Sequence, residues 1–141
     1  MPDKTRVMVF GTFDGLHEGH RNLFAQAKTH GDTLIVIVAR DTTVQKVKGK
    51  KPIFNENNRL AAVKHQQGVD GAYLGNTDDV YRVIIVHAPE VICLGYDQKT
   101  FTDSLANWLS AQYRPIPIIR LQPYKPDIYK SSLLTKKEQQ E

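Results

Sequence analysis

Two histidines near the start of the chain have the residue type and spacing to act on phosphate. His17 and His20 are three residues apart, so on a helix both imidazole rings would face one point. Glycine recurs at every fourth position around them, at Gly11, Gly15 and Gly19. Glycine lets a ligand approach the backbone closely, and the first amides of a helix are unpaired and attract anions. The segment therefore predicts a phosphate site in which histidine stabilises developing charge.

Two simpler interpretations of this segment stay open. The glycines also suit a plain tight turn, and histidines at i and i+3 can bind a metal. No third histidine, cysteine or cluster of carboxylates lies near the pair in the sequence, so we expect no metal held by the protein. The four-residue spacing of the glycines fits neither the dinucleotide fingerprint nor the P-loop, which excludes both motifs.

The elements around the histidines must hold both rings at one point. The apolar residues 6–10 precede them and predict a strand that is buried on both faces. After His20, apolar residues recur at helical spacing. They predict a helix over about residues 18–30, with Gly31 as its C′ residue. We therefore expect the histidines at a turn from strand to helix.

The rest of the chain alternates between short apolar runs and helical patterns. The apolar runs predict four further strands, at residues 33–39, 69–74, 91–94 and 116–121. The intervening helical patterns begin at Asn55, at Asp78 or Asp79, and before Leu105. Residues 41–54 lack apolar periodicity and are predicted to be a loop. This alternation indicates an α/β fold with a doubly wound, five-stranded parallel sheet, and the length suits a single domain over residues 1–141.

Loops that follow the strands of such a sheet meet at one edge, where ligands bind beyond the carboxyl ends of the strands. The segments expected at that edge are residues 11–20, 41–54, 95–98 and 122–132. The second of them carries a lysine cluster: Lys46, Lys48, Lys50 and Lys51. Beside an amide cradle these charges indicate a triphosphate ligand, although four lysines on a solvated loop remain the alternative.

Composition limits the classes of protein that the chain can belong to. The 141 residues are 40% hydrophobic and 24% charged, as in ordinary globular proteins. They contain neither an apolar run that could span a membrane nor a secretory signal, and a single cysteine, Cys93, fits a reducing cytoplasm. The net charge is +4, but no basic stripe interleaved with aromatic residues is present. We therefore expect a cytoplasmic protein that binds a small polyphosphate, with no nucleic-acid or membrane partner.

Two short segments resemble a known signature. Gly11-Thr12-Phe13-Asp14 followed by His17-Glu18-Gly19-His20 is similar to the motif of the HxGH nucleotidyltransferase superfamily, in its cytidylyltransferase-like group. The resemblance implies a Rossmann-like nucleotidyltransferase fold and transfer of a nucleotidyl group to a substrate phosphate, with release of pyrophosphate. An attacking phosphate is already largely ionised near neutral pH and needs no general base. The catalytic residues that the resemblance implies are His17, His20 and Lys48.

Nucleotide-binding residues follow from the same resemblance. They are Gly11, Thr12, Phe13, Gly19, Lys46, Arg59, Asp97, Tyr124, Ser131 and Ser132. Some of them keep an alternative role. Arg59 contacts either phosphate or only the adjacent loop, and Asp97 accepts from a ribose or base, or caps a helix. The serine pair faces the triphosphate or only caps a short C-terminal helix, and both roles can coexist.

Segments over nearly the whole chain resemble one branch of this group, the archaeal-type FAD synthases. They are residues 38–41, 48–52, 94–98 and 130–132. The resemblance implies FMN adenylyltransferase activity, with ATP and FMN as substrates, FAD and pyrophosphate as products, and a divalent cation. The alternative is a cytidylyltransferase that acts on glycerol 3-phosphate or another phosphorylated small molecule, but residues 124–132 lack its C-terminal segment. The sequence leaves the oligomeric state open, a homodimer included.

Overall fold

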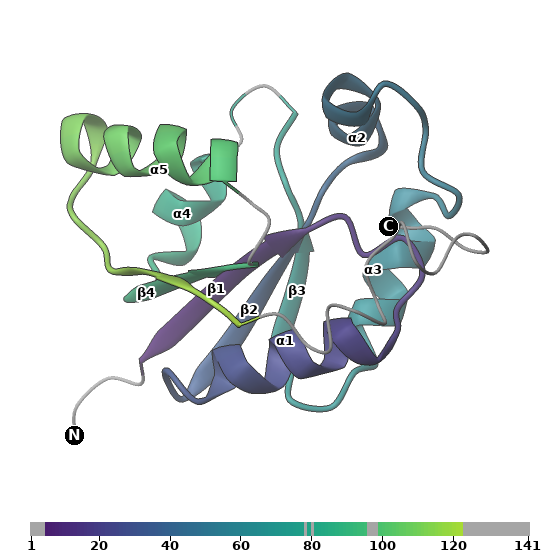
Figure 1. The fold of residues 1–141 in the computed structure, drawn as a ribbon, viewed down its shortest axis with the longest axis horizontal. Coiled ribbons are helices and arrows are strands. Elements are labelled where there is room, and N and C mark those ends of the chain that lie inside the picture. Colours follow the sequence, from purple (N-terminus) through teal and green to yellow (C-terminus); the bar gives the residue numbers. More distant parts are fainter. Residues whose placement is uncertain (1–4, 78, 80, 96–98, 123–141) are drawn as a thin grey trace.

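Five parallel strands form the central sheet in the part of the chain that this computed structural model describes, residues 5–77, 79, 81–95 and 99–122 (Figure 1). The strands are β1 (Arg6–Gly11), β2 (Thr33–Val38), β3 (Gly71–Leu74), β4 (Val91–Leu94) and β5 (Ile118–Arg120). Their order across the sheet is β3-β2-β1-β4-β5, so β1 lies between β2 and β4. The winding reverses beside β1, which confirms the expected doubly wound sheet. The carboxyl end of β1 therefore lies at the switch point, where such folds bind ligands.

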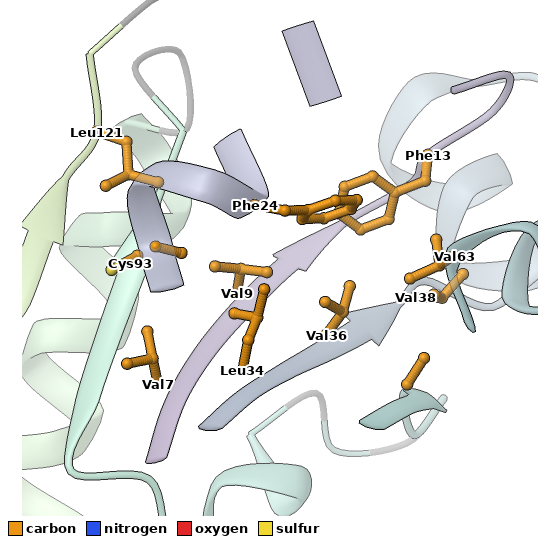
Figure 2. Close-up of a cluster of buried hydrophobic side chains, with 12 residues drawn as sticks. Val7, Val9, Phe13, Phe24, Leu34, Val36, Val38, Val63, Cys93 and Leu121 are labelled. Atoms are coloured by element: carbon orange, nitrogen blue, oxygen red, sulfur yellow. The ribbon is translucent and has the colours of Figure 1, made fainter. Parts of the chain in front are cut away.

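Helices cover both faces of this sheet (Figure 1). On one face, α1 (Glu18–Lys28) and α3 (Glu56–Lys64) contribute Phe24 and Val63 to a buried cluster with β1 and β2. Figure 2 shows this cluster, in which the rings of Phe13 and Phe24 lie beside each other. On the other face, α4 (Arg82–His87) and α5 (Lys99–Gln112) contribute to a second cluster. Burial of the central strands on both faces explains their continuous apolar runs.

Residues 41–48 form a helix, α2 (Asp41–Lys48), so the prediction of a loop is wrong for these residues. Only Val44 is buried on this helix, which explains why no apolar periodicity marks it in the sequence. Its first turn is stabilised from α3, because the Glu56 carboxylate accepts the Asp41 N–H at 2.8 Å. Gly49 ends it with a φ of 78°, a left-handed conformation that glycine adopts without strain.

The end of α1 also differs from the prediction. The helix stops at Lys28, and its C-cap is Thr29 in a right-handed conformation. Gly31 is therefore not the predicted left-handed C′ residue, since its φ is not positive. A Cβ at Gly31 would lie 2.7 Å from the carbonyl oxygen of Thr5, so the absence of a side chain serves close packing there.

The remaining boundaries agree with the predictions to within a few residues. Strand β4 has the predicted bounds, whereas β3 and β5 are shorter than the apolar runs that indicated them. Asn55 caps α3 as predicted, because its side chain accepts the Asn58 N–H at 2.8 Å. Helix α4 begins at Arg82, later than the acidic residues 78 and 79 suggested. The predicted C-terminal helix lies outside the described residues.

Candidate active site

The two histidines occupy the start of α1, directly after the loop that leaves β1. His17 is the N-cap of the helix, and its Nδ1 accepts the Gly19 N–H at 2.9 Å. His20 is the third helical residue, and its Nδ1 accepts the His17 N–H at 3.3 Å. The pair therefore forms a reciprocal capping box, a role usually held by serine or threonine with glutamate. The ring centroids are 4.1 Å apart, with an angle of 31° between the planes.

These contacts determine the tautomer of both rings. A nitrogen that accepts a backbone N–H must carry a lone pair, so Nδ1 is unprotonated in each ring. In the neutral imidazole the proton is then on Nε2, which becomes a hydrogen-bond donor. The helix start thus fixes the tautomer of both rings and makes each Nε2–H a donor group.

The pKa of His20 is lowered from 6.5 to about 3, and its ring is therefore neutral near pH 7. Burial is the largest cause, followed by the neighbouring charges of His17, Arg21 and Lys48. The ring acts as a neutral donor rather than as a cation in the protein without ligand. The charge of Lys48 is the smallest of these influences on the His20 ring. Lys46 lies in the same last turn of α2, with an exposed side chain.

Phe13 packs against the His20 ring of the pair. Its ring is buried, meets the His20 ring in a T-shaped arrangement with centroids 5.4 Å apart, and packs on Phe24 (Figure 2). Its backbone has a φ of 53°, which is uncommon for a non-glycine residue and turns the chain sharply before the helix. Because the ring is buried, only the backbone of Phe13 is available for the predicted contact with nucleotide.

Two glycines of the segment leave room for these rings. A Cβ at Gly19 would lie 2.7 Å from Cε1 of His17, and a Cβ at Gly11 would lie 2.5 Å from Cζ of Phe13. Both distances are too short for any side chain. The glycines that were predicted to admit a ligand therefore also admit the side chains that build the site.

Arg59 contacts the adjacent loop, which is the second of the two roles that the sequence left open. Its side chain is almost completely buried, and its guanidinium donates to the carbonyl oxygens of Thr12 and Phe54 at 2.8 and 2.9 Å. It also forms an ion pair with Asp41, at 2.6 Å. One buried cation therefore joins the histidine loop, the segment before α3, and the start of α2.

Asp14 makes a parallel connection that sequence reasoning missed. Its carboxylate oxygens accept the N–H groups of Ile53 and Phe54 at 2.7 and 2.8 Å. Together with Glu56, which accepts from Asp41, it holds the lysine-bearing helix near the histidines. The position of Asp14 inside the signature was the only sequence signal for this role.

Several predicted residues do not receive a test from the structure. Asp97, Tyr124, Ser131 and Ser132 lie outside the described residues, and they remain predictions. Thr12 uses its carbonyl oxygen to bind Arg59.

Within the described part of the chain, no group of three His, Cys, Asp or Glu residues is placed to hold a metal ion. Burial raises the pKa of the Cys93 thiol to about 11, so it stays protonated at neutral pH.

Comparison with known proteins gives consistent matches over most of the chain. The sequence model of the cytidylyltransferase-like family matches residues 8–134. A protein of Thermoplasma acidophilum named FAD synthase is 41% identical over 132 residues, which are 94% of this chain and 92% of that protein. A protein of the same name from Thermoplasma volcanium is 40% identical over the same shares.

Solved structures agree on the fold. The structure of a protein described as a lipopolysaccharide core biosynthesis protein from Thermoplasma volcanium has a TM-score of 0.81 and 40% identity. The match covers 87% of this chain and 100% of the Thermoplasma volcanium chain. An Archaeoglobus fulgidus protein of unknown function is 18% identical with a TM-score of 0.68, covering 84% of this chain and 90% of that one, which supports the fold alone. No helix among the described residues is both long and apolar enough to cross a membrane.

Proposed function

Because the chain belongs to the cytidylyltransferase-like family, we propose that it is an FMN adenylyltransferase, which makes FAD and pyrophosphate from FMN and ATP. The two Thermoplasma relatives named FAD synthase support this choice of substrates, since they match almost the full length of the chain at about 40% identity. The observation in the site that carries the proposal is the histidine pair, with two adjacent rings at the start of one helix whose Nδ1 atoms both accept backbone N–H groups.

The reaction needs positioning and charge stabilisation more than proton transfer. A phosphate oxygen of FMN attacks the α-phosphorus of ATP and forms the new P–O bond. The bond from that phosphorus to the bridging oxygen of pyrophosphate breaks, and pyrophosphate leaves with the electron pair. The phosphate of FMN has a second pKa of about 6, so it attacks as the anion without a base.

In this proposal the histidines stabilise the charge that grows on the leaving group. Nε2–H of His17 and of His20 donates to phosphate oxygens, and the positive end of the α1 helix dipole attracts the anionic oxygens beside them. Lys48 adds a positive charge from α2, and Lys46 supports it from the same turn. A donor that is fixed before the substrate arrives needs no rearrangement during the reaction.

The nucleotide occupies the edge of the sheet around these groups. Backbone atoms of Gly11, Thr12, Phe13 and Gly19 line the phosphates, while Arg59 acts by holding the surrounding loops. Asp97 and Tyr124 contact the nucleoside, and Ser131 and Ser132 face the triphosphate; these four assignments depend on the family resemblance.

A divalent cation fits this site as a partner of ATP rather than as a resident of the protein. Both carboxylate oxygens of Asp14 already accept amides, and no cluster of metal-binding side chains is present among the described residues. A cation such as magnesium is commonly bound through substrate phosphates, and it would neutralise part of their charge. The protein side chains then contribute hydrogen bonds and the lysine charge.

The test is to incubate the purified protein with ATP, magnesium and FMN, and to identify the products by chromatography together with pyrophosphate release. FAD in amounts equal to pyrophosphate is the expected result. Riboflavin should not react, because its hydroxyl would need a base. Parallel reactions with CTP and glycerol 3-phosphate test the alternative. Turnover of that pair, and none of FMN, would contradict the proposal.

A further inference from the structure

Exposed large hydrophobic residues occur in two parts of the chain among the described residues. One group lies between the end of α2 and the start of α3: Val47, Ile53 and Phe54. The other lies on β3 and α4: Tyr73, Ile85 and Val86. Single exposed apolar side chains are ordinary, but a group beside a catalytic site indicates a contact with a ligand or partner.

The backbone under Ile53 and Phe54 is firmly held. Their two N–H groups donate to the Asp14 carboxylate at 2.7 and 2.8 Å, and the Phe54 carbonyl oxygen accepts from Arg59 at 2.9 Å. The two residues are nevertheless 85% and 47% exposed. An ordered segment thus presents two apolar side chains to solvent, next to the histidine loop.

Phe54 lies within reach of the reacting phosphate. A Cβ built on Gly15 would be 3.7 Å from Cε2 of Phe54. Gly15 is two residues from His17, a span of at most ~7 Å of extended chain. The ribityl chain of FMN separates its phosphorus from its ring by seven bonds, or roughly 8 Å at the length per bond of an extended polypeptide. An FMN molecule with its phosphate near His17 therefore carries its ring to the neighbourhood of Phe54.

The second apolar group suits this role less well. Strand β3 is at the edge of the sheet, two strands from β1, which is about 10 Å at the usual strand spacing. The Tyr73 ring there already stacks on His87, with centroids 4.3 Å apart. Phe54 makes no aromatic ring contact with another of the residues described, and 47% of its surface is exposed.

We infer that Ile53 and Phe54 form the platform on which the isoalloxazine ring of FMN stacks. The inference rests on the proposed function and adds the residue that distinguishes FMN from smaller phosphorylated acceptors. The flat, apolar faces of the isoalloxazine ring match an exposed aromatic ring and a branched aliphatic side chain. The anchoring to Asp14 and Arg59 holds this platform at a constant distance from the histidines.

The first experiment compares the FMN and ATP kinetics of Phe54→Ala with the wild type. We expect the KM for FMN to rise about tenfold, within the range found when an aromatic stacking partner is removed. The KM for ATP should change by less than twofold, and Phe54→Tyr should restore the FMN value. Ile85→Ala is the matched control, since it removes a similarly exposed side chain from α4. An unchanged KM for FMN, or an equal rise for both substrates, overturns the inference.

The second experiment measures the contact directly, with Phe54→Trp, which also serves if Phe54→Ala fails to fold. An indole stacked on isoalloxazine quenches flavin fluorescence, so FMN should lose more fluorescence on binding this variant than on binding wild type or Val86→Trp. Equal quenching in the three proteins overturns the platform, as does greater quenching by Val86→Trp.

The wild-type reaction separates the two proposals. If wild type makes FAD but the Phe54 variants keep wild-type FMN kinetics and quenching, only the platform is wrong, and the segment contacts another part of this chain or a partner. If wild type makes no FAD, the proposed function fails and the platform fails with it.

Discussion

The centroids of the imidazole rings of His17 and His20 lie 4.1 Å apart, and backbone N–H groups at the start of α1 hold both rings. Nδ1 of His20 accepts the N–H of His17, while Nδ1 of His17 accepts the N–H of Gly19. The same two contacts cap the helix and select the tautomer that donates from Nε2. Structure and proposed catalysis therefore use opposite nitrogens of the same rings.

Replacement of either histidine should reduce turnover while the nucleotide still binds. We expect His17→Ala and His20→Ala each to lower kcat by at least about 10², since each removes a donor to the developing charge. Single-turnover FAD formation measures the chemical step, and ATP binding by calorimetry measures the ground state. His30→Ala, an exposed residue past the end of α1, is the control and should behave as wild type. Turnover near wild type in either variant would remove the proposed role.

Addition of one methyl group at Gly19 should affect the site more than the fold. Its Cβ would lie 2.7 Å from Cε1 of His17, so the ring must move. We expect kcat to fall by about 10², because a displaced donor is lost for charge stabilisation. The free energy of unfolding should change by about 1 kcal/mol at most, since loss of the His17 cap is offset by the better helix propensity of alanine.

Gly75→Ala is the matched control for that substitution. The nearest side-chain atom to its Cβ would be Cγ2 of Ile37, at 3.4 Å, so little needs to move. If Gly19→Ala and Gly75→Ala keep the same turnover, the position of the His17 ring is not decisive.

Local patterns in the sequence predicted much of this structure. The histidine spacing, the apolar runs of β1 and β2, and the Asn55 cap are all signals over a few residues, and the structure confirms them. The doubly wound sheet followed from the alternation of such signals.

The role of Arg59 could not be predicted because its partners are distant in the sequence. Thr12 is 47 residues away and Asp41 is 18 residues away, so no periodicity connects them. Helix α2 was not predicted for the same reason, since its first turn is stabilised by Glu56, which is 15 residues away from Asp41. In addition, only Val44 is buried on this helix, so it has no apolar periodicity. Long-range polar contacts are set by the assembled fold, and a pattern of hydrophobicity contains no record of them.

Loss of the buried Arg59 guanidinium should destabilise the fold strongly. We expect Arg59→Met to lower the free energy of unfolding by about 2–3 kcal/mol, because the partly exposed Asp41 loses its partner and two part-buried carbonyl oxygens lose their donor. Arg59→Lys should recover only part, as one ammonium cannot reach all three acceptors. Urea unfolding gives both values.

The exposed pair of Arg21 and Glu18 provides the comparison for Arg59. Its side chains are 48% and 59% exposed, and Arg21→Met should cost about 1 kcal/mol at most. Similar losses in Arg59→Met and Arg21→Met would mean that Arg59 does not hold the three segments together.

The protonation of His20 should make the fold sensitive to acid. Its pKa falls from 6.5 to about 3 on folding, so between these values the unfolded chain binds a proton that the native state does not. The contribution of His20 to stability is therefore complete above pH 6.5 and is lost as the pH falls toward 3. Urea unfolding at pH 7.5 and pH 5 should show a smaller pH dependence for His20→Gln than for wild type. An equal dependence would mean that the ring is not protected from protonation.

The two lysines at the end of α2 should contribute unequally to ATP binding. The charge of Lys48 is one of the causes of the lowered pKa of His20. Lys48→Ala should therefore raise the KM for ATP and lower kcat more than Lys46→Ala does. The double variant should raise the KM for ATP more than the KM for FMN. Raising the ionic strength should increase the KM for ATP in wild type but much less in the double variant, because the screened charges are already absent. If the double substitution and added salt both leave the KM for ATP unchanged, these lysines are surface charges without a role in the site.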